Sequence, residues 1–414
     1  MNLLVHHIKE LVPVRTDGAP WLAGDRMREL GTLHDASVVV RDGIIQWVGP
    51  SVDLPAGLAD DLHQLDASAH VALPGFVDSH THLVFAGSRD EEFAMRSAGM
   101  TYQEIANRGG GILNTVKATR AAARKDLKRS ASRFLDLLMR HGTTTVEIKS
   151  GYGLDPESET KMMEVISDLA SEHFLTVVRT FLGAHAVPPE HRVDPERYIE
   201  IVIDRMLPHI ARRSLADFCD VFCENGYFSV DQSRRILTAA RALGLKLKIH
   251  ADELAASGGS ELAAELRAVS ADHLEHVSDK GIRQLREAGV VAVMLPGVSF
   301  FLNHGYAPAR SLIEEGVPVA IASDFNPGSC MSFSIPMMMT IACTQMRMTV
   351  EECIAATTIN GAAAVGLSHR LGSIEVGKDA DIVLYDIPNY RHLAYHFGAN
   401  HAVKIIKRGT ILEF

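Results

Sequence analysis

The sequence predicts an α/β fold: a (β/α)8 TIM-like barrel with a small β-sandwich domain built from both chain ends. Three observations predict it. The middle of the chain alternates short apolar runs with longer helix-like stretches, the two end segments carry only short strands and turns, and the end segments are alike in character. The 414 residues suffice for one large and one small domain.

Eight apolar, β-branched runs predict the strands of the barrel. Near-continuous apolar strands that alternate with amphipathic helices indicate a parallel sheet covered by helices, and eight such units can close into a barrel. The expected strands are residues 71–78, 143–149, 175–182, 218–223, 245–249, 269–271, 290–295 and 317–322. The expected helices are residues 125–141, 157–172, 195–212, 230–243, 259–266 and 279–288.

Hairpin signals at both ends predict the small β domain. Arg41-Asp42-Gly43 separates two β-branched runs, and Arg408-Gly409 separates two more near the C-terminus. One domain built from both ends, with the barrel inserted between them, is the most economical interpretation. The expected divisions are 1–70 for the first part of the sandwich, 71–368 for the barrel and 369–414 for the second part.

Composition and charge exclude several classes of protein. The net charge of −10 argues against a nucleic-acid partner, because phosphate contacts need clustered Lys and Arg. No stretch approaches the ~18 apolar residues of a membrane span, and residues 1–7 lack the basic and apolar parts of a signal peptide. We therefore expect a cytoplasmic protein with no membrane partner. An odd number of cysteines in a long chain predicts reduced thiols at Cys219, Cys223, Cys330, Cys343 and Cys353.

Two histidines follow the first expected strand, at the mouth of the barrel. The segment Asp78-Ser79-His80-Thr81-His82 places His80 and His82 two residues apart, so both face the same side of an extended chain. Two imidazoles on one face are a natural start for a zinc or iron site. A His-x-His pair alone is more often structural, so the case depends on what ends the other strands.

Three further strands end in residues that can bind a metal or move a proton. His250 ends the fifth, His273 the sixth and Asp324 the eighth, and functional residues of such barrels sit at the C-terminal ends of strands. The pattern predicts one divalent ion, Zn²⁺ or iron, held by His80, His82, His250 and Asp324, with a water in an open position. Asp324 would also accept the water's proton, and His273 would help to deprotonate the water or stabilise an oxyanion. His273 could also be a core histidine bonded to a carbonyl.

Longer segments resemble a known family. Residues 74–82, the histidines of strands five and six, Ser323-Asp324 and residues 372–381 resemble the amidohydrolase superfamily. Residues 82–93, 109–112, 147–154, 181–189 and 323–329 resemble the imidazolonepropionase family in particular, and the resemblance runs from about residue 35 to the end. It implies hydrolysis of 4-imidazolone-5-propanoate to N-formimidoyl-L-glutamate, the third step of histidine degradation, by a mononuclear zinc or iron enzyme that forms a homodimer.

The resemblance also implies residues for a small anionic imidazolone substrate. Arg89 follows strand one and would hold the propionate by two parallel hydrogen bonds, although a surface ion pair with Asp90 or Glu91 is the alternative. Glu253 would accept a hydrogen bond from a ring N–H and take part in catalysis. The other implied substrate and product contacts are Tyr152, His185, Asn326, Gly328 and Ser329.

Two local features limit the alternatives. Dinuclear amidohydrolases carry a carbamylated lysine on strand four, and here that run has no lysine; Lys149 ends the second run, so we expect one ion. Gly109-Gly110-Gly111 lacks the Lys-Ser/Thr of a phosphate loop and follows no strand, which favours a flexible turn. The rival functions are an aminohydrolase of the same superfamily, which would release ammonia, and a non-catalytic assembly protein that has lost its metal.

Overall fold

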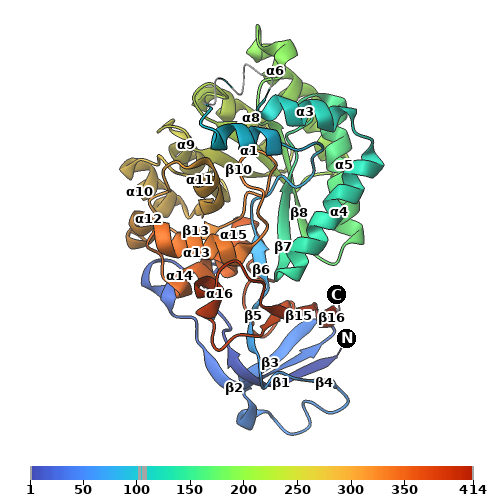
Figure 1. The fold of residues 1–414 in the computed structure, drawn as a ribbon, viewed down its shortest axis with the longest axis vertical. Coiled ribbons are helices and arrows are strands. Elements are labelled where there is room, and N and C mark those ends of the chain that lie inside the picture. Colours follow the sequence, from blue (N-terminus) through green and yellow to red (C-terminus); the bar gives the residue numbers. More distant parts are fainter. Residues whose placement is uncertain (1, 101–103, 105–109, 413–414) are drawn as a thin grey trace.

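The computed structural model describes residues 2–100, 104 and 110–412, and it confirms the predicted barrel. Eight strands form one sheet, and each pair of neighbouring strands is parallel (Figure 1). In order they are β6 (Phe76–Asp78), β7 (Thr143–Lys149), β8 (Thr176–Ala184), β9 (Phe218–Cys223), β10 (Lys246–Ala251), β11 (Ser270–His273), β12 (Val291–Met294) and β13 (Val319–Ile321).

The first and last barrel strands meet through the segments that follow them. The backbone N–H of Asp324 donates to the carbonyl of His80 over 3.0 Å, and the N–H of His82 donates to the carbonyl of Phe325 over 3.0 Å. These bonds bring the end of β13 beside the end of β6. Three of the four expected metal ligands therefore lie on two directly bonded segments, which fixes their spacing through the backbone.

Helices cover the outside of the barrel. The expected stretches 125–141, 157–172, 230–243, 259–266 and 279–288 are helical, whereas 195–212 is divided by a π-helical turn, η4 (Val202–Met206). The helices are α1 (Asp90–Ser97), α3 (Ile112–Ala121), α4 (Arg124–Arg140), α5 (Pro156–Glu172), α6 (Pro195–Ile201), α7 (Leu207–Arg212), α8 (Val230–Ala242), α9 (Gly259–Glu265), α10 (Asp279–Ala288), α11 (Pro296–Leu302), α12 (Ala309–Glu315), α13 (Ile335–Gln345), α14 (Val350–Thr357), α15 (Ile359–Ala364) and α16 (His392–Tyr395).

Local sequence sets the ends of these helices. Asp155 accepts a hydrogen bond from the N–H of Ser158 at the start of α5, where Pro156 occupies the first turn. Ser229 and Gln232 form a reciprocal capping box at the start of α8. These caps satisfy N–H groups that a helix start otherwise leaves unpaired, so each helix begins directly after its βα loop.

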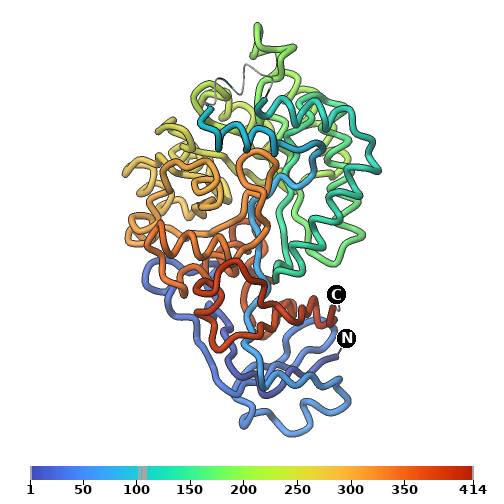
Figure 2. The backbone as a smooth tube through the Cα atoms, in the orientation of Figure 1, coloured from blue at the N-terminus to red at the C-terminus, as the bar shows by residue number. Residues whose placement is uncertain are grey.

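Both chain ends build the small β domain, as predicted. Figures 1 and 2 show the N-terminal and C-terminal segments together at one end of the barrel. Among the described residues, three short 3₁₀ helices lie in connections: η1 (Gly24–Arg28), η2 (Ser51–Asp53) and η3 (Pro189–His191). The eight strands of this domain form one connected sheet: β1 (Leu3–Leu11), β2 (Leu33–Arg41), β3 (Ile44–Pro50), β4 (His63–Asp66), β5 (Val71–Pro74), β14 (Ile382–Tyr385), β15 (Ala402–Lys407) and β16 (Thr410–Leu412).

The expected first barrel strand, residues 71–78, is two strands in two different sheets. β5 pairs with β1 and β14 of the small sheet, while β6 pairs with β7 of the barrel. Gly75 stands between them, and a Cβ there would lie 2.7 Å from the Cβ of Thr144, so only glycine allows this close approach. We propose that the boundary between small domain and barrel lies at Gly75 rather than at residue 70.

The cysteines and the length of the helices bear on two further predictions. All five cysteines are free thiols. Within the described part of the chain, no helix is both long and apolar enough to span a membrane.

Candidate active site

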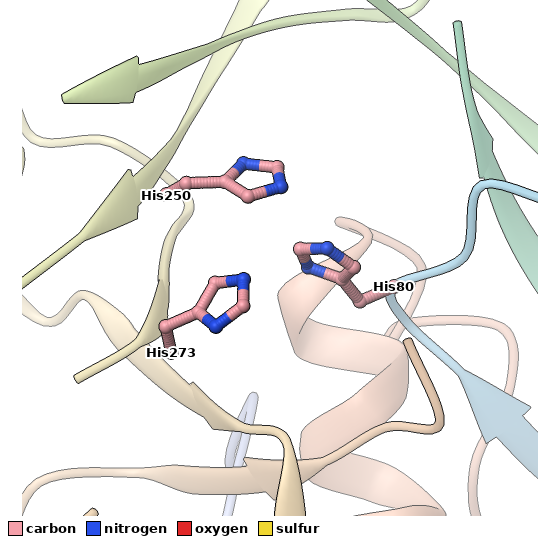
Figure 3. Close-up of side chains that lie close together, drawn as sticks. All are labelled: His80, His250 and His273. Carbon is pink, nitrogen blue, oxygen red and sulfur yellow. The ribbon is translucent and has the colours of Figure 1, made fainter. Parts of the chain in front are cut away.

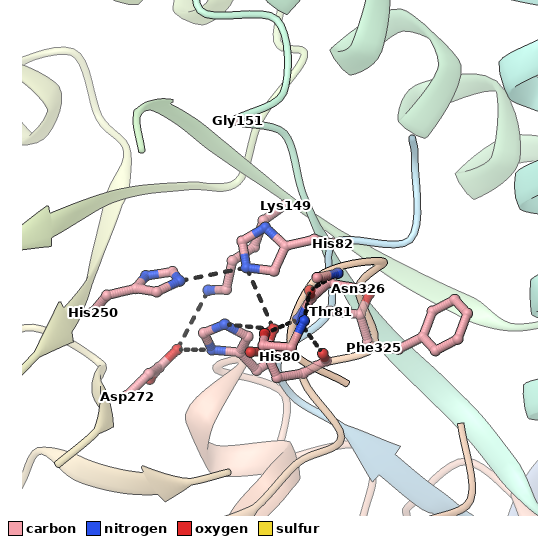
Figure 4. Close-up of polar contacts among 12 residues, drawn as sticks. His80, Thr81, His82, Lys149, Gly151, His250, Asp272, Phe325 and Asn326 are labelled. Atoms are coloured by element: carbon pink, nitrogen blue, oxygen red, sulfur yellow. Dashed lines mark hydrogen bonds and ion pairs between the residues drawn. The ribbon is translucent and has the colours of Figure 1, made fainter. Parts of the chain in front are cut away.

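Four potential ligand atoms converge at the mouth of the barrel. Asp324 Oδ1 lies 3.6 Å from His80 Nε2 and 3.6 Å from His82 Nε2. His250 Nε2 lies 3.4 Å from His82 Nε2 (Figure 4). Ligands bonded at about 2.0–2.1 Å to a tetrahedral zinc lie roughly 3.3 Å apart. The ligand atoms of His80, His82 and Asp324 all lie within 4.8 Å of one another, close enough to share one cation, and His250 adjoins them beside His82.

The protonation states of these side chains also suit the binding of a cation. His80 Nε2 and Asp324 Oδ1 are buried, and neither has a hydrogen-bond partner among the described residues. Burial lowers the pKa of His80 and of His82 well below the ordinary value, so both imidazoles are neutral and offer a lone pair. Burial raises the pKa of Asp324, a cost that a positive charge beside it would remove. The donor set thus suits zinc or iron.

Carboxylates hold the outer nitrogens of two of these histidines. Asp272 Oδ2 lies 2.7 Å from His80 Nδ1, and Asp220 Oδ2 lies 2.9 Å from His250 Nδ1. Such partners fix the tautomer and orientation of a ligating imidazole. The sequence pattern alone does not mark Asp220 or Asp272 as site residues. A charged residue inside an otherwise apolar strand was the signal that could have identified them.

His273 lies beside the ligand cluster and faces Glu253. Nitrogen atoms of His273, His80 and His250 all lie within 4.8 Å of one another (Figure 3). His273 Nε2 lies 3.5 Å from Glu253 Oε2, an arrangement that suits proton transfer better than a core role. Burial raises the pKa of Glu253 to about 7, although the neighbouring His250 opposes this. A carboxyl group with that pKa can accept or donate a proton near neutral pH.

The backbone that presents His273 is strained. His273 has φ 82° and the next residue, Leu274, has φ 71°. Two consecutive non-glycine residues in the left-handed region are unfavourable, so the surrounding structure must hold them there. Asp324 is also left-handed, with φ 46°. Left-handed backbone thus occurs at the ends of both β11 and β13, at the two residues whose side chains lie beside the other ligands.

Two expected substrate contacts lie on one side of the ligand cluster. The imidazole of His185 stacks on that of His82, with ring centroids 4.9 Å apart and an interplanar angle of 17°. Tyr152 lies 5.5 Å from His185 and 5.8 Å from His82 between ring centroids. Burial lowers the pKa of His185 to about 3, and its Nδ1 donates to the carbonyl of Gly151 over 3.0 Å. His185 is therefore neutral, and its Nε2 is an acceptor.

Arg89 pairs with Glu92 rather than with Asp90 or Glu91. Its Nε and Nη2 donate to Glu92 Oε2 over 3.0 and 2.8 Å, and only 15% of its side chain is exposed. The surface ion pair considered as the alternative is thus not present. The guanidinium lies against Gly328, where a Cβ would overlap Nη1 and approach Cζ to 2.7 Å. This contact places the guanidinium of Arg89 at the turn that follows Asp324.

The expected product-binding turn is held together by its own hydrogen bonds. Asn326 Oδ1 accepts from the N–H groups of Gly328 and Ser329, each over 2.8 Å. Asn326 Nδ2 donates to the carbonyl of Asp324 and to Ser329 Oγ, each over 2.7 Å. Because Asn326 Nδ2 and the N–H groups of Gly328 and Ser329 all donate within the turn, these contacts indicate that Asn326 shapes the turn beside Arg89.

The glycine-rich segment is partly described. Gly109 lies outside the described residues. Gly111 precedes α3 with φ 92°, and its N–H donates to Glu92 Oε1 over 3.1 Å. Because this N–H contacts the carboxylate that also holds Arg89, the described end of the segment acts as a turn that supports the Arg89–Glu92 pair.

Lys149 points into the barrel and is fully buried. Its Nζ donates to Asp220 Oδ2 over 2.7 Å and lies 3.0 Å from Glu147 and 3.3 Å from Asp272. Burial alone would lower the pKa of Lys149, but these three carboxylates outweigh it and raise the pKa. The amine is therefore protonated and occupied, which is incompatible with a bridging carbamate.

Comparisons with known proteins agree with this geometry. The model of the amidohydrolase family matches residues 71–412. Imidazolonepropionases from Geobacillus kaustophilus and Parabacteroides distasonis are each 49% identical to the chain, over 99% of its length and over 97% and 98% of theirs.

Solved structures show the same fold at lower sequence identity. A zinc-bound adenosine deaminase from Xanthomonas campestris is 18% identical, with a TM-score of 0.72 over 99% of this chain and 92% of that chain. The zinc complex of atrazine chlorohydrolase from Arthrobacter aurescens is 16% identical, with a TM-score of 0.69 over 99% and 95% of the two chains.

Proposed function

The chain belongs to the imidazolonepropionase family of amidohydrolases, and we propose on that premise that it hydrolyses 4-imidazolone-5-propanoate to N-formimidoyl-L-glutamate. This is the third step of histidine degradation. The observation that carries the proposal is the convergence of three imidazole nitrogens and one carboxylate oxygen at the barrel mouth, beside a partly buried arginine. A small, neutral, hydrolysable ring with an anionic tail matches both features.

We propose His80, His82, His250 and Asp324 as the ligands of one divalent ion, zinc or iron. When bound there, such an ion supplies a Lewis acid that lowers the pKa of a water towards ~7. The protonated state of Lys149 supports a single ion, because a second ion in this superfamily depends on a carbamylated lysine. The neutral imidazoles and the unpartnered oxygen of Asp324 support the ligand assignment.

The protein side chains handle the protons of the reaction. Asp324 and His273 accept the proton of the attacking water, and His273 donates a hydrogen bond to the oxygen of the former carbonyl. Glu253, which faces His273 over 3.5 Å and has a pKa of about 7, accepts a hydrogen bond from the ring N–H. The proton that His273 takes from the water passes to Glu253 across this contact, and Glu253 delivers it to the ring nitrogen as the C–N bond breaks. The ring then opens to the formimidoyl product.

Other side chains position the substrate. Arg89 binds the propionate through charge-assisted hydrogen bonds. Tyr152 and His185, whose ring centroids are 5.5 Å apart, contact the substrate ring, and the neutral His185 Nε2 can accept a hydrogen bond from it. Asn326, Gly328 and Ser329 form the turn that holds Arg89 in place and contacts the product.

The resemblance to the family further supports a homodimer located in the cytoplasm. Light scattering of the purified protein tests the first point. A mass that corresponds to one chain would exclude the dimer.

One assay tests the function. The absorbance of 4-imidazolone-5-propanoate is followed with the purified protein, before and after dialysis against a chelator. We expect loss of the substrate, no ammonia in the first turnovers, abolition of activity by the chelator and recovery with Zn²⁺ or Fe²⁺. Activity that survives complete metal removal would contradict the proposal, and rapid ammonia release from cytosine or guanine would favour an aminohydrolase instead.

A further inference from the structure

We propose that Lys149 is a positioning residue that orients two metal ligands at once. A single buried ammonium holds Asp220 and Asp272, and these carboxylates hold the outer nitrogens of His250 and His80. The inference rests on the metal site of the proposed function. It explains a group that the hydrolytic steps leave unused, namely a charged lysine in the interior of the barrel.

The first branch runs from Lys149 to His250. Nζ donates to Asp220 Oδ2 over 2.7 Å, and the same oxygen lies 2.9 Å from His250 Nδ1. The other oxygen of Asp220 accepts from the N–H groups of Val221, over 2.7 Å, and of His250, over 3.2 Å. The carboxylate is therefore fixed on both sides and can hold the imidazole in one orientation.

The second branch runs from Lys149 to His80. Nζ donates to Asp272 Oδ2 over 3.3 Å, and that oxygen lies 2.7 Å from His80 Nδ1 (Figure 4). Ser270 Oγ donates to the other oxygen of Asp272 over 2.6 Å. The two branches therefore share the same design: one lysine, one carboxylate with a second anchor, and one imidazole.

This arrangement sets the tautomer of each imidazole. A carboxylate next to Nδ1 keeps the proton on that nitrogen, so the lone pair lies on Nε2, the atom that faces the other ligands. The side chains of Lys149, Asp220 and Asp272 are fully buried, where an unpaired charge would be costly. Without the ammonium, two adjacent carboxylates would repel each other, and one of them would become protonated or turn away from its histidine.

Lys248 offers a matched comparison. It is also fully buried, and it lies 3.2 Å from Glu147 and 3.6 Å from Asp272, while its Nζ donates to the carbonyl of Ser79 over 2.9 Å. Among the described residues, Lys248 contacts Glu147 and Asp272 but not Asp220. Lys248 therefore balances charge in the same network without linking the two branches.

The test measures zinc affinity and histidine tautomers, not turnover. Zinc dissociation constants of the wild type, Lys149→Met and Lys248→Met are determined by competition with a chromophoric chelator. Loss of a group that orients metal ligands typically costs 10–100-fold in affinity, and we expect a loss of that size for Lys149→Met. For Lys248→Met we expect a change of only a few-fold.

The second readout uses ¹⁵N-histidine spectra of the metal-free proteins, with the two imidazoles assigned from single His→Gln variants. Wild type should show His80 and His250 as Nδ1–H tautomers, and Lys149→Met should lose both signatures. Asp220→Asn breaks one branch only and should alter His250 while leaving His80 unchanged; it decides the question if Lys149→Met fails to fold.

Three results would overturn the inference. The first is a Lys149→Met protein with the zinc affinity and the histidine tautomers of the wild type. The second is an equal loss of zinc affinity in the two lysine variants. The third is an Asp220→Asn spectrum in which His250 is unaltered or His80 changes as well. A wild-type protein that binds no zinc would instead refute the proposed metal site, so the two failures are distinguishable.

Discussion

Replacing Gly328 with alanine should weaken binding of the substrate's carboxylate by displacing Arg89. A Cβ at this position would overlap Nη1 and lie 2.7 Å from Cζ of Arg89, whereas ordinary contact between carbon atoms is about 3.5–4.0 Å. The guanidinium must therefore shift by roughly 1 Å, which is comparable to the tolerance of a hydrogen bond. Because the obstructing atoms are the end of a flexible side chain, the protein should still fold.

The magnitude follows from the bond that is lost. A hydrogen bond to a charged group contributes about 1.5–3 kcal/mol, which corresponds to roughly a 10- to 150-fold decrease in kcat/KM. This decrease should appear mainly as a higher KM, because the carboxylate of the substrate is remote from the reacting carbonyl. Arg89→Ala should give a loss at least as large.

The assay compares two substrates and a matched variant. Steady-state kinetics are measured with 4-imidazolone-5-propanoate and with a ring that lacks the propionate, for which Gly328→Ala should resemble the wild type. Gly305→Ala is the control, because a Cβ at Gly305 meets no atom within 4 Å. An unchanged KM, or an equal loss on the ring without a carboxylate, would refute the role of the Arg89–Gly328 contact.

The remaining predictions concern proton transfer and stability. His273→Ala should lower kcat by roughly 10²–10⁴-fold while metal analysis shows full occupancy; near-normal kcat would remove His273 from the mechanism. Glu352, whose side chain is fully buried, accepts from Arg28, Arg310 and the N–H of Thr349. Burial alone would raise the pKa of Glu352, but these bonds lower it below its ordinary 4.5, so its stabilising effect is present above that pH and lost as the pH falls through the lowered pKa. Glu352→Gln should therefore unfold with about 1.5–3 kcal/mol less free energy at pH 7, and its denaturation curves should converge with those of the wild type on acidification; a difference independent of pH would contradict this.

The sequence determined the barrel and predicted a set of metal ligands, because both depend on local patterns. Apolar runs alternating with capped helices predict parallel strands, and parallel strands place their C-terminal ends at one mouth. His80, His82, His250 and Asp324 could therefore be grouped without coordinates, and the structure brings their ligand atoms within 3.4–3.6 Å of their nearest partners in the cluster.

Pairing between distant segments was decided by the tertiary structure alone. Residues 71–78 form a single apolar run in the sequence, yet the strands before and after Gly75 join different sheets, because only their partners distinguish them. The sequence predicts Arg89 near the mouth, but its pairing with Glu92 rather than Asp90 or Glu91 depends on how α1 packs against Gly111.

The buried charges near the proposed metal site show the same difference between what the sequence and what the tertiary structure determines. The sequence shows that Glu147 and Lys149, like Lys248 and His250, are two residues apart and therefore share one face of a strand. It does not show that this face is the barrel interior, or that a lysine of β7 reaches carboxylates of β9 and β11. Strand periodicity is set by neighbouring residues, whereas the pairing of buried charges depends on distances across the barrel, which exist only once all eight strands have closed.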